Sequence, residues 1–235
     1  MTTYAANASY GELIWRRFKR HKLGVLGAIV TAAIYFVALF SEFLAPHAQA
    51  TYKARDVYAP PQFVKFIAEE DDGSRSFQLH VLGYISKIDY NSGKRTFEAD
   101  PRKVISLGFW VKGDPYKLWG LFKMDRHFFG PVKSRDRVYF FGADRLGRDV
   151  LSRTIHATRV SMSIGLVGVA LSLVLGITIG GLSGYFGGVV DLGIQRLIEI
   201  LQSIPSIPLW IGLAAAIPPT APPLQTYFLI TVILS

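Results

Sequence analysis

The chain has 235 residues, of which half are hydrophobic, a net charge of +9 and no cysteine. The absence of cysteine excludes disulfides, thiolate metal ligands and a cysteine nucleophile. Residues 45–159 contain 20 Lys/Arg and 13 Asp/Glu, whereas residues 160–235 contain one and two. This segregation indicates a membrane protein with a large polar loop, and it excludes a basic nucleic-acid groove.

The N-terminal residues 1–22 are basic and precede an uncharged apolar run. We assign residues 23–44 to a first transmembrane helix, and the basic cluster predicts a cytoplasmic N-terminus because Lys and Arg resist translocation. A cleaved signal peptide is the alternative, with a small-residue site at residues 48–50. The apolar run is longer than a signal-peptide core, however, and the site lies well beyond its end.

Residues 45–141 are predicted to form an extracytoplasmic β-rich insert, because long loops are translocated regardless of their Lys and Arg content. Sequence patterns predict strands at residues 77–90, 104–111 and 137–141, and turns at residues 91–94, 114–115 and 130–131. The aromatic residues of the insert are interpreted as its core, with a docking surface as the alternative. They are Phe109, Trp110, Tyr116, Trp119, Phe122, Phe128 and Phe129.

The sequence contains no convincing catalytic or metal-binding pattern. The stretch Ser92-Gly93-Lys94 lacks the upstream glycine spacing of a P-loop, and no Gly-x-Ser-x-Gly elbow is present. The five histidines stand far apart in the sequence without paired spacing, which argues against a metal site. They are His21, His47, His80, His127 and His156.

Residues 142–159 are predicted to form an interfacial amphipathic segment. Glycines allow a tight approach there, alternating Asp and Arg can pair with each other, and aliphatic side chains can turn toward lipid or a helix bundle. The polar and glycine residues of this candidate site are Asp144, Gly147, Arg148, Asp149, Ser152 and Arg153.

Residues 160–185 are predicted to form a second transmembrane helix, since Val160 to Val190 contains no Asp, Glu, Lys or Arg. Small residues recur every fourth position on one face of this helix, which lets another helix backbone approach closely. The predicted packing seam consists of Gly168, Ser172, Gly176, Gly180 and Gly184.

Residues 186–196 are predicted to form a cytoplasmic turn, after which Arg196 and Glu199 can pair near the interface. A third transmembrane helix is expected at residues 197–217. Pro205 and Pro208 each remove an internal helix bond, so they predict a kink or break beside the translocation pathway.

The last segments are an extracytoplasmic turn at residues 218–223 and the start of a fourth helix at residues 224–235. About 12 helical residues span roughly 18 Å, which is too short for a hydrocarbon core of about 30 Å. We therefore expect the fourth helix to be truncated in this chain.

Residues 142–153 resemble the signature of the permease subunits of ABC importers for dipeptides, oligopeptides and related solutes, especially the second of their two permeases. Ala143 replaces the usual Thr, and residues 156–161 match only in part. The similarity continues through residues 184–191, 196–199 and 204–205, and it includes the basic N-terminus and first span. Only the loop is atypical in length.

The resemblance implies a membrane all-α helical bundle of the type I ABC importer class, with a β-rich extracytoplasmic insert between the first and second spans. It implies a multi-pass protein of the bacterial inner membrane that is a transport subunit and no enzyme. The expected partners are a second permease, two ATPase subunits, an extracytoplasmic solute-binding protein and the lipid bilayer, with no nucleic acid. No cofactor is expected in this chain, because the ATPase subunits would bind ATP and Mg²⁺.

The family's cytoplasmic coupling loop, which docks in the ATPase subunit, does not occur in this sequence. An alternative hypothesis is therefore a membrane-anchored extracytoplasmic β-domain that acts as a binding or scaffold protein. The sequence does not identify the transported solute.

Overall fold

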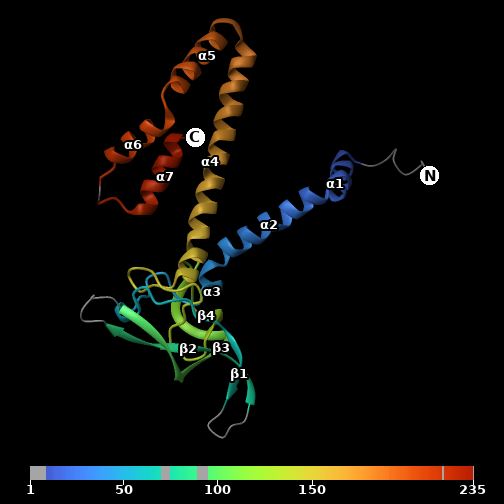
Figure 1. The fold of residues 1–235 in the computed structure, drawn as a ribbon. Helices are drawn as coiled ribbons and strands as arrows, with labels where there is room; N and C mark the ends of the chain where they lie inside the picture. Colours follow the sequence, from blue (N-terminus) through green and yellow to red (C-terminus); the bar gives the residue numbers. More distant parts are fainter. Residues whose placement is uncertain (1–8, 70–74, 89–94, 219, 235) are drawn as a thin grey trace, which may run out of the picture. The chain divides into compact units, whose positions relative to one another are not determined.

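The computed structural model describes residues 9–69, 75–88, 95–218 and 220–234 (Figure 1). The chain divides into two compact units, residues 1–159 and residues 160–235. The boundary falls inside helix α4, Val150–Phe186.

The first unit begins with two consecutive helices, α1 (Tyr10–Arg20) and α2 (Lys22–Leu39). The side chain of Ser9 accepts from the backbone N–H of Glu12 and so caps α1, while the ring of His21 caps α2. Helix α2 has no charged residue after Lys22 and its side chains are almost all exposed, so its apolar surface is left without protein cover.

Helices α2 and α4 are the two helices among the described residues that are long and apolar enough to cross a membrane, by length and composition only. The segment predicted as one helix at residues 23–44 is interrupted at Phe40, and a short helix α3 (Ser41–Leu44) follows.

An antiparallel sheet follows a short 3₁₀ helix at Ala54–Asp56. Its strands run in chain order (Figure 1) and are β1 (Lys65–Glu69), β2 (Arg75–Ile88), β3 (Arg95–Leu118) and β4 (Phe122–Pro131). Strand β3 changes partner along its length. Residues 95–106 pair with β2, and residues 107–118 pair with β4. The two halves of this long strand therefore connect β2 and β4 within one four-stranded sheet.

Strand β2 confirms the predicted strand over residues 77–88, while residues 89–90 lie outside the described residues, and β3 includes the strand predicted at residues 104–111. The turns predicted at residues 114–115 and 130–131 are wrong. Asp114 and Pro115 lie where the β3–β4 register shifts, so the missing N–H of proline falls in an interruption of the ladder. Pro131 is the last residue of β4. The turn predicted at residues 91–94 lies outside the described residues.

Residues 137–141 do not form the predicted strand, although Val138 and Tyr139 are buried. Their backbone N–H groups donate to side chains, to His47 Nε2 at 3.1 Å and to Gln62 Oε1 at 2.7 Å. The apolar pattern correctly indicated burial, but side-chain acceptors replace a neighbouring strand.

The interpretation of the aromatic residues as a core is wrong. The core is small and mainly aliphatic, with Val81, Ile105, Leu107 and Val138 at its centre. Most of the aromatic residues of β3 and β4 are instead exposed: Phe109, Trp110, Trp119, Phe122 and Phe128. Their rings contact each other and the end of α2 at the surface.

Arg159 ties α4 to the end of α2 within the first unit. Its guanidinium donates to the carbonyl oxygens of Ala38 at 2.9 Å and Leu39 at 2.8 Å, and it forms an ion pair with Glu42. The last carbonyl groups of a helix have no partner within that helix, so Arg159 satisfies two of them.

The second unit contains the rest of α4, α5 (Gly188–Ser203), α6 (Ser206–Ala216) and α7 (Pro223–Leu234). Helix α4 runs without interruption from the predicted interfacial segment into the predicted span. The predicted turn at residues 186–196 is confined to Gly187 and the residues beside it, where Gly187 and Gly188 have positive φ angles. Helix formation resumes at once because glycine adopts these angles without strain.

The break predicted in the third helix is confirmed at Pro205, which separates α5 from α6. Pro208 does not kink the chain. It lies in the first turn of α6, where a backbone N–H would have no intrahelical acceptor in any case.

We predict that Arg159→Lys lowers the free energy of unfolding of the chain in detergent by about 2 kcal/mol, because a single ammonium cannot replace a planar group that reaches two carbonyls and a carboxylate. The matched control is Arg196→Lys, since the Arg196 side chain is 75% exposed and pairs with Glu199 three residues away. That change should alter unfolding by less than about 0.5 kcal/mol. Equal effects in urea titrations would contradict this role of Arg159.

Candidate functional site: the polar junction at the start of helix α4

The motif loop, residues 142–149, is organised around the carboxylate of Asp144. One oxygen accepts from the backbone N–H groups of Leu146 at 2.8 Å and Arg148 at 3.0 Å. The other accepts from the side chains of Arg148 and Arg153. The predicted pairing of alternating Asp and Arg is therefore present, with one carboxylate serving both arginines.

Burial alone would raise the pKa of Asp144, but hydrogen bonds from the Arg148 and Leu146 backbone and from the two arginine side chains outweigh it. They lower the pKa of Asp144 to about 2. Asp144 is therefore a permanent anion at physiological pH, suited to holding the loop in one conformation.

Gly147 completes this loop with a φ angle of +74°. Its carbonyl accepts from the backbone N–H of Lys53 at 3.0 Å, and an added Cβ would lie 2.1 Å from the Lys53 carbonyl oxygen. Both the backbone conformation and the close approach require glycine here. The motif loop is thus docked against the segment that follows α3.

Asp149 and Ser152 form the buried start of α4. Asp149 Oδ2 accepts from the Ser152 backbone N–H at 2.8 Å, which is an N-cap bond, and from the Ser152 hydroxyl at 2.6 Å. The same hydroxyl oxygen accepts from the backbone N–H of His47 at 3.0 Å. Asp149 Oδ1 is buried without a hydrogen-bond partner, and burial raises the pKa of Asp149.

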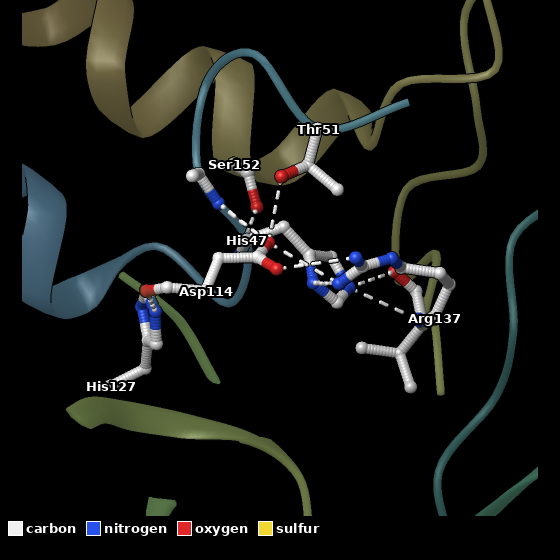
Figure 2. A network of polar contacts seen from close by, with 8 residues as sticks. His47, Thr51, Asp114, His127, Arg137 and Ser152 are labelled. Carbon is white, nitrogen blue, oxygen red and sulfur yellow. Dashed lines mark hydrogen bonds and ion pairs between the residues drawn. The ribbon is translucent and has the colours of Figure 1, made fainter. Parts of the chain in front are cut away.

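His47 joins this helix start to Arg137 and Val138, which follow the sheet in the chain (Figure 2). Its Nδ1 lies 3.3 Å from Arg137 Nη1, and its Nε2 lies 3.2 Å from the carbonyl oxygen of Val138. The Arg137 guanidinium and the Val138 backbone N–H, which lies 3.1 Å from Nε2, can only donate, so at least one ring nitrogen must be unprotonated and accept. The geometry therefore requires a neutral imidazole.

Asp114, from the bulge in β3, holds Arg137 in place by a two-pronged ion pair with both distances 3.2 Å. The Asp114 carboxylate also accepts from the Thr51 hydroxyl at 2.7 Å and the Ala48 backbone N–H at 3.3 Å (Figure 2). Burial opposes ionisation of Asp114, but the Thr51 hydrogen bond and the Arg137 charge outweigh it and lower its pKa. The Asp114 carboxylate of β3 thus connects that strand to residues 47–51 and to Arg137.

Three of the five histidines meet at this junction, although they are far apart in the sequence. His127 is buried, with Nδ1 2.6 Å from the Ala45 carbonyl oxygen and Nε2 2.9 Å from the Asp114 carbonyl oxygen. His156 Nε2 faces the His47 carbonyl oxygen at 3.4 Å. Their ring nitrogens mainly face backbone groups, and no cluster of metal-binding side chains occurs among the described residues.

The other predicted site residues lie in the second unit. The side chains around Gly176, Gly180 and Gly184 leave open space at the positions where a Cβ would stand. Gly168 and Ser172 line an open apolar hollow together with Ile164, Val169 and Thr231. The predicted pair of Arg196 and Glu199 is present at 2.7 Å, at an exposed position.

Sequence reasoning missed several residues that build the junction: Glu42, His47, Asp114, Arg137 and Arg159. Each is an isolated polar residue in its own segment, with no local spacing that connects it to the others. The one weak indication in the sequence was that Glu42 and Arg159 are oppositely charged residues at the ends of two apolar segments, which suggests an ion pair.

Comparison with known proteins places these segments in a family context. Residues 9–61 match the family model described as the N-terminal TM domain of oligopeptide transport permease C. The chain is 28% identical over 199 residues to the dipeptide transport system permease protein DppC of Lactococcus lactis subsp. cremoris, covering 85% of this chain and 47% of that protein. The resemblance to the peptide-importer permeases is confirmed.

Two further relatives have similar names. The peptidoglycan transport system permease protein YejE of Agrobacterium fabrum is 27% identical over 87% of this chain and 56% of its own length. The DppC protein of Haemophilus influenzae is 44% identical over 83 residues, covering 35% of this chain and 28% of that protein. The chain spans about half the length of the first two relatives. No solved structure matches the chain.

The match to the permease family model has a structural counterpart at the junction. Residues 9–61 include the segment that contributes Glu42, His47, Thr51 and Lys53. Strands β1 to β4 lie outside this match. Residues 9–61 therefore supply one side of the junction, and the motif loop supplies the other.

We predict that Gly147→Ala destabilises the first unit far more than Gly120→Ala does. Both glycines have a φ angle close to +75°, but a Cβ at Gly120 meets nothing within 4 Å. Gly120→Ala should cost about 1 kcal/mol from backbone strain alone, and Gly147→Ala should cost more because it must also push back the Lys53 carbonyl. Thermal unfolding in detergent measures the difference, and similar melting shifts would contradict the docking of the loop.

We also predict that acid weakens this junction through His47. Burial, followed by the neighbouring Arg137 charge, lowers the pKa of His47 from 6.5 to about 4. The unfolded chain then binds a proton that the folded chain does not, so stability is complete above pH 6.5 and is lost as the pH falls toward 4. The loss attributable to His47 is about 3 kcal/mol.

Urea unfolding followed by tryptophan fluorescence at pH 7 and pH 4.5 checks this expectation. His47→Gln keeps a donor and an acceptor without a titratable ring, so it should lose less stability between the two pH values than the wild type. His80→Gln, which replaces a buried histidine of β2 outside this junction, should retain the wild-type pH dependence. An unchanged pH dependence in His47→Gln would disprove the assignment.

Proposed function

We propose that the chain forms part of a transmembrane permease subunit of an ATP-driven importer for peptides or peptide-like solutes. The observation that supports this most strongly is the alignment of 85% and 87% of the chain with a dipeptide and a peptidoglycan transport permease. Two helices of membrane-spanning length and an apolar exposed surface on α4 agree with it.

In this proposal the helices form a bundle in the inner membrane with the N-terminus in the cytoplasm. A second permease subunit completes the pathway, and an extracytoplasmic binding protein delivers the solute. Two ATPase subunits bind ATP and Mg²⁺ and drive the change between inward- and outward-facing states. The break at Pro205 frees backbone groups of α5 and α6 that a polar pathway can satisfy.

The polar junction then acts as a rigid connector at the extracytoplasmic end of α4. The first turn of α4 is hydrogen-bonded through Ser152 to His47 and is capped by Asp149. The motif loop is held in one conformation by hydrogen bonds to Asp144. A movement of α4 would therefore be transmitted to the sheet, where a delivered solute or its binding protein could respond. The charged side chains at this junction pair with each other, so in this proposal they hold α4 and the motif loop in position and do not contact the solute.

The glycine seam of α4 is proposed as the contact with another helix of the bundle. Gly176, Gly180 and Gly184 are exposed and have open space around the missing Cβ. In lipid, small residues let helix backbones approach closely, and the gain comes from packing rather than burial from water.

We predict that Gly176→Leu combined with Gly180→Leu prevents assembly, because two isobutyl groups would hold the facing helix away. The measurement is purification from the native membrane, with identification of the subunits that remain bound. Gly181→Leu is the matched control, since it adds the same group to the same helix off the seam and with the same open space.

Recovery of ATPase subunits and a second permease with the wild type and the Gly181→Leu variant, but not with the double variant, would support the proposal. Normal recovery of the partner subunits with the double variant would show that the glycine seam is not needed for assembly. A wild type that carries no ATPase partner would instead favour a membrane-anchored β-domain with a binding or scaffold role.

A further inference from the structure

The tip of the β3–β4 hairpin is fixed to the end of helix α2. The indole N–H of Trp119 donates to the carbonyl oxygen of Leu39, the last residue of α2, at 2.8 Å. The Trp119 ring also lies 5.9 Å from the ring of Phe40. Trp119 and Gly120 both have positive φ angles, so the chain reverses sharply at this contact.

This contact determines the depth of the hairpin tip if α2 crosses the bilayer, so the inference rests on the proposed function. Eighteen helical residues extend about 27 Å, close to the thickness of a hydrocarbon core of about 30 Å. Leu39 then lies where the helix leaves the core. Trp119 is held at the same level, where the amphipathic indole ring is favoured.

The side chains at the tip are apolar and uncovered. Leu121 is 75% exposed and Phe122 is 58% exposed, and Trp119 is also exposed. A second group of aromatic rings lies further along the same hairpin, where Phe43 of α3 contacts Trp110 of β3 and Phe128 of β4. Apolar groups of this size at the end of a membrane-spanning helix indicate contact with lipid.

The charges flanking the tip complement a phospholipid surface. Lys117 and Lys123 are directly opposite each other in the β3–β4 register, and both are exposed. Like charges at opposed positions destabilise a hairpin, unless an anionic surface neutralises them. No acidic residue occurs between Tyr116 and Met124. Long lysine side chains can extend from a buried apolar tip to phosphate groups.

We propose that the β3–β4 hairpin tip, residues 117–123, is a membrane-interface anchor. Trp119, Leu121 and Phe122 enter the boundary between acyl chains and headgroups beside the end of α2. Lys117 and Lys123 contact lipid phosphates. The bilayer is chosen over a protein partner because the hydrogen bond to Leu39 places the tip at the bilayer surface.

The absence of native cysteine allows a direct test in the full chain reconstituted into vesicles. Nitroxide labels are attached to three single-cysteine variants, Leu121→Cys, Phe77→Cys and Ala32→Cys. Their accessibility to oxygen and to a water-soluble nickel chelate reports their depth. Phe77 is the matched control, because it is 80% exposed and lies on β2 opposite Ile67 of β1, in a different strand pair from the tip.

The expected result is a deep label at residue 32, an interfacial label at residue 121 and an aqueous label at residue 77. A deep label at residue 32 with an aqueous label at residue 121 would overturn the anchor and leave the proposed function intact. An aqueous label at residue 32 would show that α2 does not cross the bilayer, and it would overturn both the anchor and the proposed function.

The lysine contacts are tested by changing the lipid. In phosphatidylcholine vesicles, added phosphatidylglycerol should lower chelate access at residue 121 several-fold. The same label combined with Lys117→Ser and Lys123→Ser should lose this dependence on lipid charge. Both substitutions are at exposed positions and leave the core of the sheet unchanged. An equal lipid response with and without the two lysines would disprove the phosphate contacts.

Discussion

The hydrogen bond between the His47 backbone and Ser152 is the contact on which the first unit depends. It joins the segment after α3 to the first turn of α4 in a region where water is excluded, so each polar group there needs a protein partner. Ser152 in turn donates to Asp149, and the His47 ring is bonded to Val138. Removing one member would leave buried donors or acceptors on at least two chain segments.

This dependence explains why so few apolar residues suffice for the sheet. Its aliphatic core is small, and the long strand β3 pairs with β2 over one half of its length and with β4 over the other. The anionic centre at Asp114 and the fork of Arg159 supply cross-links between segments that the core does not join. Charged hydrogen bonds of this kind gain strength where they are partly shielded from water.

The apolar surfaces of the chain have a common interpretation if the bilayer is the solvent for part of it. Helices α2 and α4 expose their apolar faces, and the hairpin tip beside Leu39 does the same with aromatic side chains. In water these surfaces would be a liability, whereas in lipid only the backbone must be satisfied internally. The exposed glycines Gly176, Gly180 and Gly184 would fit the same setting as the proposed helix contact, since packing between helices in lipid requires close backbone approach.

The sequence by itself indicated the apolar runs that form α2 and α4, the strand over residues 77–88 and the break at Pro205, because these depend on local composition and on the missing N–H of proline. It also identified Asp144, Gly147 and Asp149 as a unit, since a tight loop with its own capping residues is a local structure. Tertiary structure alone decided the role of His47, Asp114, Arg137 and Arg159, which come from distant segments and meet only because buried polar groups must be paired. It likewise decided that Pro115 lies in a bulge, that residues 137–141 bond to side chains, and that the aromatic residues face outward.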